Sequence, residues 1–238
     1  MPAAIEFTDV EKRYRDHQVL NGISLEINAG EFVGLIGING AGKTTLIKCL
    51  LDFVLPDSGS IRVFSVHHRD TRARERLAFL PEKFNPPYYL NGHDFLRYMG
   101  DLYGAKYGDS DIRQLLKILD LDYSALIKPV RQYSKGMSQK LGLAACFLSG
   151  RELLIMDEPM SGLDPRARAW LKQYLLEQKT DGRTLFFSTH LLADVEVLAD
   201  RIAVLHNGVV KYNGSITGCY EKYHTADIEK AYLNCIAE

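Results

Sequence analysis

The stretch "GINGAGKTT", Gly37 to Thr45, matches the pattern G-x-x-x-x-G-K-[ST] of a phosphate-binding loop, and it decides the fold. Glycines let backbone N–H groups close around phosphate oxygens, Lys43 supplies charge to the β- and γ-phosphates, and Thr44 offers a hydroxyl to Mg²⁺. A chance glycine-rich turn is the alternative, and the flanking sequence disfavours it. The candidate ligand-binding residues of the loop are Gly37, Asn39, Gly40, Ala41, Gly42, Lys43, Thr44 and Thr45.

The flanks of the loop have the patterns of a strand and a helix. The apolar run Phe32 to Ile36 precedes the loop, as a buried strand would, and a helix is expected from Lys43 to about Val54. Such a helix points the positive end of its dipole at a bound anion. We therefore expect a strand–loop–helix unit that binds a nucleotide.

Bulk composition excludes several classes of protein. The chain has 238 residues, of which 46% are hydrophobic, and its 29 Lys and Arg nearly balance its 30 Asp and Glu, so a generic nucleic-acid binder is not expected. The four cysteines are widely spaced, which is typical of reduced thiols in a cytosolic protein. No signal-peptide pattern is visible, and no apolar run reaches the roughly 18 residues that a membrane helix needs. We expect a soluble protein whose membrane role, if any, is exercised through a partner.

Patterns along the rest of the chain predict an α/β fold with an insertion. The strand patterns "LLIMD", "TLFFST" and "RIAVLHNGVVKYNG", the last with a hairpin signal at Asn207-Gly208, predict a mainly parallel sheet flanked by helices. "PDSG", Pro56 to Gly59, predicts a turn before a strand "SIRVFS". We expect a single domain, 1–238, with an α/β core (1–81 and 151–215), an inserted helical subdomain (82–150) and a short C-terminal extension (216–238).

Two acids and a histidine follow apolar strands. Asp157 can hold the Mg²⁺ shell and Glu158 can polarise an attacking water, which are the roles that phosphoryl transfer requires. Two solvated acids that close a strand are the alternative. His190 ends another apolar strand; a lone histidine there is more often structural, but it could also hydrogen-bond a γ-phosphate and the water.

Five motifs occur in a fixed order: the phosphate loop, "YSKGMSQKLGLA" from Tyr133, "LLIMDEP", "SGLD" from Ser161, and "STH". This set resembles the ATP-binding subunit of ABC transporters, from about Ile5 to Ser215. The resemblance implies a P-loop NTPase with a RecA-like, mainly parallel sheet, an antiparallel β subdomain and an inserted helical subdomain. It also implies ATP and Mg²⁺ as cofactors and ATP hydrolysis that powers a separate multi-span membrane subunit.

The resemblance further implies roles for single residues. Tyr14 matches the aromatic residue that stacks on adenine. Without the resemblance, a tyrosine buried in a strand would be the favoured interpretation. Ser134 and Gly136 match the signature loop, which binds the γ-phosphate of ATP held by the opposite subunit, and Asp164 matches the loop that links the two sites. Glu158, His190 and Lys43 match the catalytic set. The expected metal contacts are Thr44, Asp157 and Glu82.

Two departures from the family pattern narrow the resemblance. Most members have Gln at the position of Glu82, and a glutamate can meet a cation but cannot donate through an amide. The common signature LSGGQ is replaced by Tyr133–Met137, "YSKGM". Both departures resemble the branch that serves ABC-2-type exporters. We therefore expect an exporter subunit that acts with a second ATPase subunit, in a homodimer, and lies in the cytoplasm, peripheral on the inner face of the cell membrane.

Other functions remain possible at this point, and two further segments each have two interpretations. A soluble ABC ATPase that acts on ribosomes or DNA is the other function, but such chains usually join two cassettes or carry long coiled coils; a GTPase should show N-K-x-D, which is absent. "FNPPYYL", Phe84 to Leu90, is either a groove for a partner helix or a loop that packs on its own subdomain. "HHRDTRARER", His67 to Arg76, favours a solvated helix face over a phospholipid or nucleic-acid patch, and His67-His68 suggests no metal.

Overall fold

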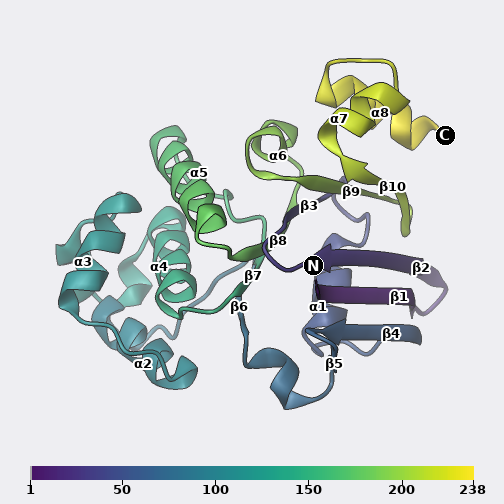
Figure 1. Cartoon of the computed structure of the whole chain (residues 1–238). Coiled ribbons are helices and arrows are strands. Elements are labelled where there is room, and N and C mark those ends of the chain that lie inside the picture. The colour runs from purple at the N-terminus through teal and green to yellow at the C-terminus, as the bar shows by residue number, and fades with distance from the viewer. Residues whose placement is uncertain (1) are drawn as a thin grey trace.

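A mainly parallel sheet lies at the centre of the computed structural model, which describes residues 2–238 (Figure 1). Its strand order is β10-β9-β3-β8-β7-β6, and only the β9–β10 pair is antiparallel. The strands are β3 (Phe32–Ile36), β6 (Leu77–Leu80), β7 (Leu153–Asp157), β8 (Thr184–Thr189), β9 (Arg201–His206) and β10 (Val209–Ser215). The sequence-based prediction of this sheet is confirmed.

The apolar runs of the sequence become the buried middle of this sheet. Every residue of β3, β7 and β8 is buried, as expected for parallel strands covered on both faces. Ile36 pairs with Thr189 and Asp157 pairs with Ser188, so the carboxyl ends of the three strands meet at one edge. The phosphate loop and both acids follow these strand ends, where open α/β sheets bind their ligands.

An antiparallel sheet lies over one face of the central sheet, and helix α1 (Lys43–Leu50) packs between the two sheets. Its order is β2-β1-β4-β5, built from β1 (Ala3–Tyr14), β2 (His17–Asn28), β4 (Ser58–Val63) and β5 (Val66–His67). Its apolar side shares a core with α1 and with the central sheet, through residues such as Ile5, Leu46 and Phe186. The helix after the phosphate loop is thereby fixed between two sheets.

Two boundaries differ from the expectation. Helix α1 ends at Leu50 rather than near Val54, because Asp52 adopts a left-handed backbone (φ 61°) and the Phe53 N–H bonds back to the Lys48 carbonyl at 2.9 Å. Strand β4 begins at Ser58, inside the expected turn, and ends at Val63. It ends there because Phe64 and Ser65 have positive φ (46° and 65°) and turn the chain into β5.

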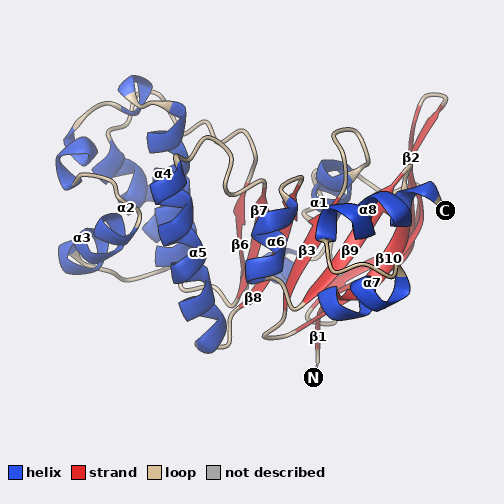
Figure 2. Cartoon of the chain, turned by 90° about the horizontal axis from the view of Figure 1, so that it is seen from above, coloured by secondary structure: helices blue, strands red, loops and turns tan. Residues whose placement is uncertain are grey.

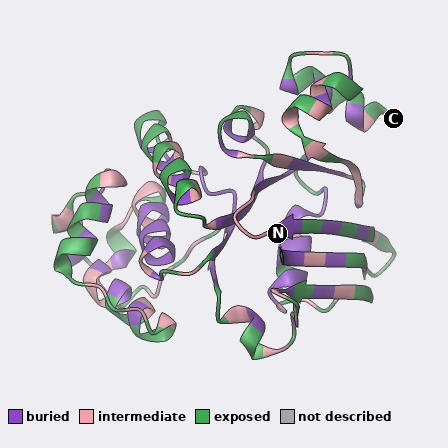
Figure 3. Cartoon of the chain, in the orientation of Figure 1, coloured by how far each residue is buried: buried purple, intermediate pink, exposed green. Residues whose placement is uncertain are grey.

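The helices between β6 and β7 form a group on the side of the central sheet away from the antiparallel sheet (Figures 1 and 2). They are α2 (Gly92–Tyr103), α3 (Asp109–Ile118), the 3-10 turns η2 (Tyr123–Ile127) and η3 (Val130–Gln132), and α4 (Lys135–Leu148). Helix α4 is the most buried of them (Figure 3), and its Gly142 lies against Leu80 and Phe84. Helix α5 (Pro165–Thr180) follows β7, and α6 (Leu192–Leu198) follows β8.

The two open segments now have definite structures. Phe84 and Leu90 pack against the core, whereas Tyr88 and Tyr89 are 71% and 73% exposed, so "FNPPYYL" is divided between packing and exposure. The expectation of a helix face at "HHRDTRARER" is wrong. The segment starts in β5, buries His68 and contains only the short 3-10 turn η1 (Thr71–Arg74), which Asp70 caps by accepting from the Arg72 N–H.

The C-terminal extension is helical, as its pattern predicts. It consists of α7 (Ile216–Lys222) and α8 (Ile228–Ala237), which lie beside β9 and β10 (Figure 2). Its buried residues, Cys219, Ile228, Ala231 and Cys235, join the core cluster of the central sheet. Within residues 2–238, no helix has the length and apolar content that would let it span a bilayer.

Candidate active site

A cavity of about 300 Å³ opens between the phosphate loop and the ends of β7 and β8. The expected residues in its wall are Asn39, Gly40, Gly42, Lys43, Thr44, Thr45, Glu82, Glu158 and His190; Val19, Ile38 and Ser161 complete it. Residues that lie far apart in the sequence therefore converge on one concave site.

Two glycines of the loop leave no room for a side chain. A Cβ on Gly37 would come 2.5 Å from the Leu205 carbonyl oxygen, and one on Gly42 would come 2.8 Å from that of Val19. Gly42 also has φ 111°, which L side chains rarely adopt. Close packing of this loop against β2 and β9 therefore requires glycine at both positions.

The loop and the start of α1 fit an anionic ligand. Lys43 is buried, and its Nζ donates to the carbonyl oxygens of Gly37 at 2.6 Å and Ile38 at 3.3 Å. Gly42, at the N-cap of α1, offers no capping side chain, and the first turn holds no acid. The N–H groups of that turn are therefore available to phosphate oxygens, as at other helix N-termini that bind anions.

A hydroxyl and a carboxylate lie together beside Lys43. Thr44 Oγ1 donates to Asp157 Oδ2 at 2.9 Å, and Ser188 Oγ donates to Asp157 Oδ1. Residues 2–238 contain no cluster of three His, Cys, Asp or Glu suited to a metal. Mg²⁺ is usually bound by one or two protein oxygens, with phosphates and water completing the shell. The donor set of Thr44 and Asp157 fits such an ion.

Glu158 stands between a lysine and a histidine. Its Oε2 is 2.9 Å from His190 Nδ1, and its Oε1 is 3.7 Å from Lys43 Nζ. Its backbone is left-handed (φ 52°), and its N–H donates to both the Oγ and the carbonyl oxygen of Ser188, at 3.1 and 3.2 Å. Left-handed non-glycine residues are costly and cluster at functional sites. This conformation aims a nearly buried carboxylate into the cavity.

Sequence reasoning missed two polar residues that support this centre. Ser188 binds the Asp157 carboxylate and the Glu158 N–H, and it is fully buried. The buried Gln139 Nε2 donates to the Pro159 carbonyl at 3.1 Å and so holds the residue after Glu158. For Ser188 the available signal was a polar residue in the largely apolar segment "LFFST". Gln139 lies between Ser138 and Lys140, so no such signal was available for it.

Seven expected residues do not line the cavity. Gly37, Ala41 and Asp157 still hydrogen-bond residues that line it, namely Lys43, Ile38 and Thr44. The other four belong to other segments of the chain.

Ser134 caps α4 by accepting from the Met137 N–H at 3.2 Å, and a Cβ on Gly136 would approach the Gly162 carbonyl to 2.9 Å. Asp164 caps α5 by accepting from the Ala167 N–H, which lowers the pKa of its carboxyl. The loop before α4 and the loop before α5 therefore lie side by side. Ser134, Gly136 and Asp164 do not line the phosphate cavity of their own chain.

Tyr14 is the fourth of these residues. It ends β1 and is 44% exposed, so the residue-based interpretation as a buried strand tyrosine is wrong. The ammonium of Lys12 lies 5.6 Å from the centre of its ring. One face of an aromatic ring is therefore accessible near the antiparallel sheet, outside the phosphate cavity.

Comparisons with known proteins agree over nearly the whole chain. Residues 20–161 match the family described as ABC transporter. An uncharacterised ABC transporter ATP-binding protein of Nostoc is 37% identical over 94% of this chain and 70% of its own length. The Nod factor export ATP-binding protein I of Burkholderia lata is 35% identical, over 98% and 78%. A solved structure of an ATP-binding subunit of an ABC transporter is 31% identical with a TM-score of 0.89, over 98% of this chain and 99% of that one.

Proposed function

The chain belongs to the ABC transporter family as an ATP-binding subunit, and on this premise we propose that it hydrolyses ATP in the cavity beside Lys43 to power a separate membrane-spanning exporter. One observation carries the proposal. The phosphate loop, Thr44 and the Glu158–His190 pair line this one cavity, and Asp157 accepts a hydrogen bond from Thr44.

Each group has a role that follows from its position. The loop N–H groups and the Lys43 ammonium bind the β- and γ-phosphates, and they stabilise the charge that develops on the phosphoryl oxygens. Thr44 and Asp157 would hold Mg²⁺, with Glu82 in the same cavity wall as Thr44, and the ion would neutralise phosphate charge. The Glu158 carboxylate orients the attacking water and accepts a proton from it. His190 Nδ1 lies 2.9 Å from that carboxylate and holds it in place.

We infer that a second copy of the chain completes the site. Ser134 and Gly136 lie at the start of α4, outside the cavity that their own chain forms, yet Lys135 Nζ donates to Ser161 Oγ, a residue of the cavity wall, at 3.0 Å. A helix N-terminus that does not line its own chain's nucleotide cavity suits a phosphate held by another subunit. A symmetric dimer would then contain two such composite sites, with Asp164 in the loop between them.

The membrane partner and the exporter role are also proposals. They are supported by Glu82 and the "YSKGM" signature, and by the Burkholderia relative whose name includes Nod factor export. The exposed Tyr88 and Tyr89 follow Glu82 closely and offer apolar area for a partner helix. Through such a partner the chain would lie on the inner face of the membrane. Nothing in the site favours an action on ribosomes or DNA.

Affinity capture from detergent-solubilised native membranes tests this proposal. The tagged chain should recover a protein with several apolar spans, and the double variant Tyr88→Ser, Tyr89→Ser should lose it while ATP hydrolysis persists. The exposed Tyr98, on α2, offers the matched control Tyr98→Ser, which should retain the partner. Recovery of ribosomes or DNA in place of a membrane protein would overturn the proposal.

A further inference from the structure

We propose that Tyr232, on the C-terminal helix α8, is a positioning residue for ATP hydrolysis. It holds the Ile38 peptide of the phosphate loop and the flank of His190 from behind. This inference rests on the proposed function, because it assigns the C-terminal extension a role at the same site.

A second, smaller cavity lies behind the phosphate loop. Its volume is about 60 Å³, and it is lined by Ile36, Gly37, Ile38, His190, Leu192 and Tyr232. Ile38 and His190 also line the nucleotide cavity, so they form the wall between the two spaces. A residue that presses on this wall from α8 acts on the loop and on the histidine together.

The Tyr232 hydroxyl faces that wall without a bond. Its oxygen is buried and has no hydrogen-bond partner among residues 2–238. Ile38 and Tyr232 line the same small cavity, and the Ile38 backbone opposes the rise in the pKa of Tyr232 that burial causes. A buried hydroxyl without a partner is costly. A small movement of the loop into the cavity would let the Ile38 N–H donate to Tyr232 Oη.

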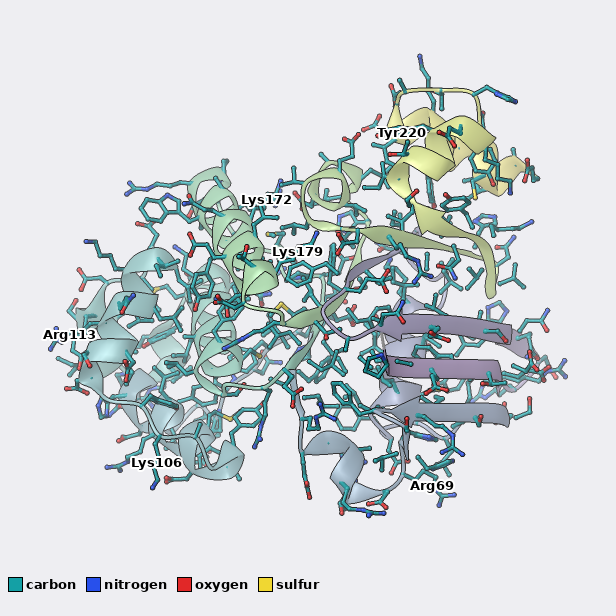
Figure 4. All side chains as sticks on the ribbon, viewed as in Figure 1. Arg69, Lys106, Arg113, Lys172, Lys179 and Tyr220 are labelled. Carbon is teal, nitrogen blue, oxygen red and sulfur yellow. The ribbon has the colours of Figure 1, made fainter. Side chains whose placement is uncertain are left out.

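Helix α8 is anchored well enough to hold a side chain in place. Ala231 and Cys235 are fully buried, and α8 contacts α6, β9 and β10. Asp227 caps its first turn through the N–H groups of Glu229 and Lys230. The preceding helix, α7, is tied to α6 by Tyr220, whose hydroxyl donates to the Glu196 carboxylate and whose position Figure 4 marks.

Ile38 and His190, which form the wall, each contact a group that we assign to the reaction. The Ile38 carbonyl accepts from Lys43 Nζ at 3.3 Å, and His190 Nδ1 lies 2.9 Å from Glu158. When the loop closes on ATP, the new bond from Ile38 to Tyr232 would fix both contacts. The hydroxyl then stabilises the nucleotide-bound chain, whereas in the free chain its burial without a partner is unfavourable.

The variant Tyr232→Phe tests this, because it removes the hydroxyl and keeps the ring. One hydrogen bond changes an equilibrium by about two- to tenfold, so Kd and KM for ATP should rise by that factor. The melting temperature without nucleotide should rise slightly, because the variant removes a buried hydroxyl that has no partner there. The matched control is Tyr220→Phe, which loses the bond to Glu196 and should lower the melting temperature without changing Kd.

Two results would overturn the inference. Wild-type Kd and KM in Tyr232→Phe would remove the role of the hydroxyl. A loss of melting temperature in Tyr232→Phe equal to that in Tyr220→Phe, with no change in Kd, would make Tyr232 a packing residue only. Failure of the wild-type chain itself to bind ATP would instead sink the proposed function, so the two failures are distinguishable.

Discussion

Replacing Ser188 with alanine should damage the site more than its small volume suggests. The serine is fully buried, donates to Asp157 Oδ1 and accepts from the Glu158 N–H at 3.1 Å. In Ser188→Ala the Glu158 N–H keeps the Ser188 backbone carbonyl at 3.2 Å, because the substitution leaves the main chain unchanged. The net loss is therefore the hydrogen bond to a buried carboxylate.

The size of the loss follows from that bond. A hydrogen bond to a charged group contributes about 1.5–3 kcal/mol to the free energy of unfolding. In a domain of this size that corresponds to a fall in melting temperature of about 3–12 °C. Loss of a partner that orients a metal-binding carboxylate typically costs about 10- to 100-fold in metal affinity or activity. We expect both effects in the same variant.

Chemical unfolding and steady-state ATP hydrolysis, measured at several Mg²⁺ concentrations, give the two quantities. Ser149→Ala is the matched control, because Ser149 is a buried serine whose hydroxyl donates to a neutral carbonyl, that of Cys146. It should lose only about 0.5–1.5 kcal/mol and retain its Mg²⁺ dependence. A Ser188→Ala variant that matches Ser149→Ala in both measurements would refute the reasoning.

Three further predictions concern the loop, the signature and the thiols. Gly42→Ala should weaken ATP binding in calorimetry more than Gly40→Ala does, because both replace a positive-φ glycine but only the Gly42 Cβ would overlap a backbone carbonyl; equal losses would contradict this. Ser134→Ala should lower ATP turnover while one subunit still binds ATP, whereas Ser215→Ala, which removes the analogous cap of α7, should leave turnover unchanged; equal turnover in the two variants would remove the role in the second subunit's site. Burial raises the pKa of the Cys146 thiol to about 12 and that of Cys49 to about 11, so alkylation of the native chain should rise only at pH values well above 9, whereas the unfolded thiols should react near 9; fast native labelling at pH 8.5 would contradict the burial.

The sequence was sufficient for the parts of the fold that depend on local pattern. Largely apolar runs predicted β3, β7 and β8 at their observed bounds, because strands buried on both faces lack the alternation of apolar and polar residues seen in half-exposed strands. The Asn207-Gly208 signal predicted the β9–β10 hairpin, and both residues have positive φ, 47° and 75°. The glycine pattern likewise predicted the loop in which Gly42 has no space for a side chain.

Tertiary contacts decided what the sequence could not show. Helix α1 ends at Leu50 because Asp52 has a left-handed backbone, and the residue type alone does not predict that conformation. The basic segment from His67 has helical composition, yet β5 pairs with β4 and buries His68. Ser188 was not singled out, because its importance arises only where β8 lies beside β7 and pairs it with Asp157. The partner that we propose for the Ser134 loop is a second copy of the chain, and contacts between copies leave no local pattern in one sequence.

We propose that Glu158 activates the attacking water in a site that two copies of the chain share. The most direct test is Glu158→Gln with ATP and Mg²⁺, followed by light scattering and by single-turnover hydrolysis. The amide keeps the shape of the side chain but cannot accept the proton, so hydrolysis should fall by roughly 10²- to 10⁴-fold while ATP stays bound. The variant should accumulate as an ATP-bound dimer, whereas the exposed Glu177, on α5, supplies the control Glu177→Gln, which should hydrolyse ATP normally. Near-wild-type turnover in Glu158→Gln would contradict the role of Glu158 as the base. A variant that stays monomeric with ATP bound would contradict the shared site.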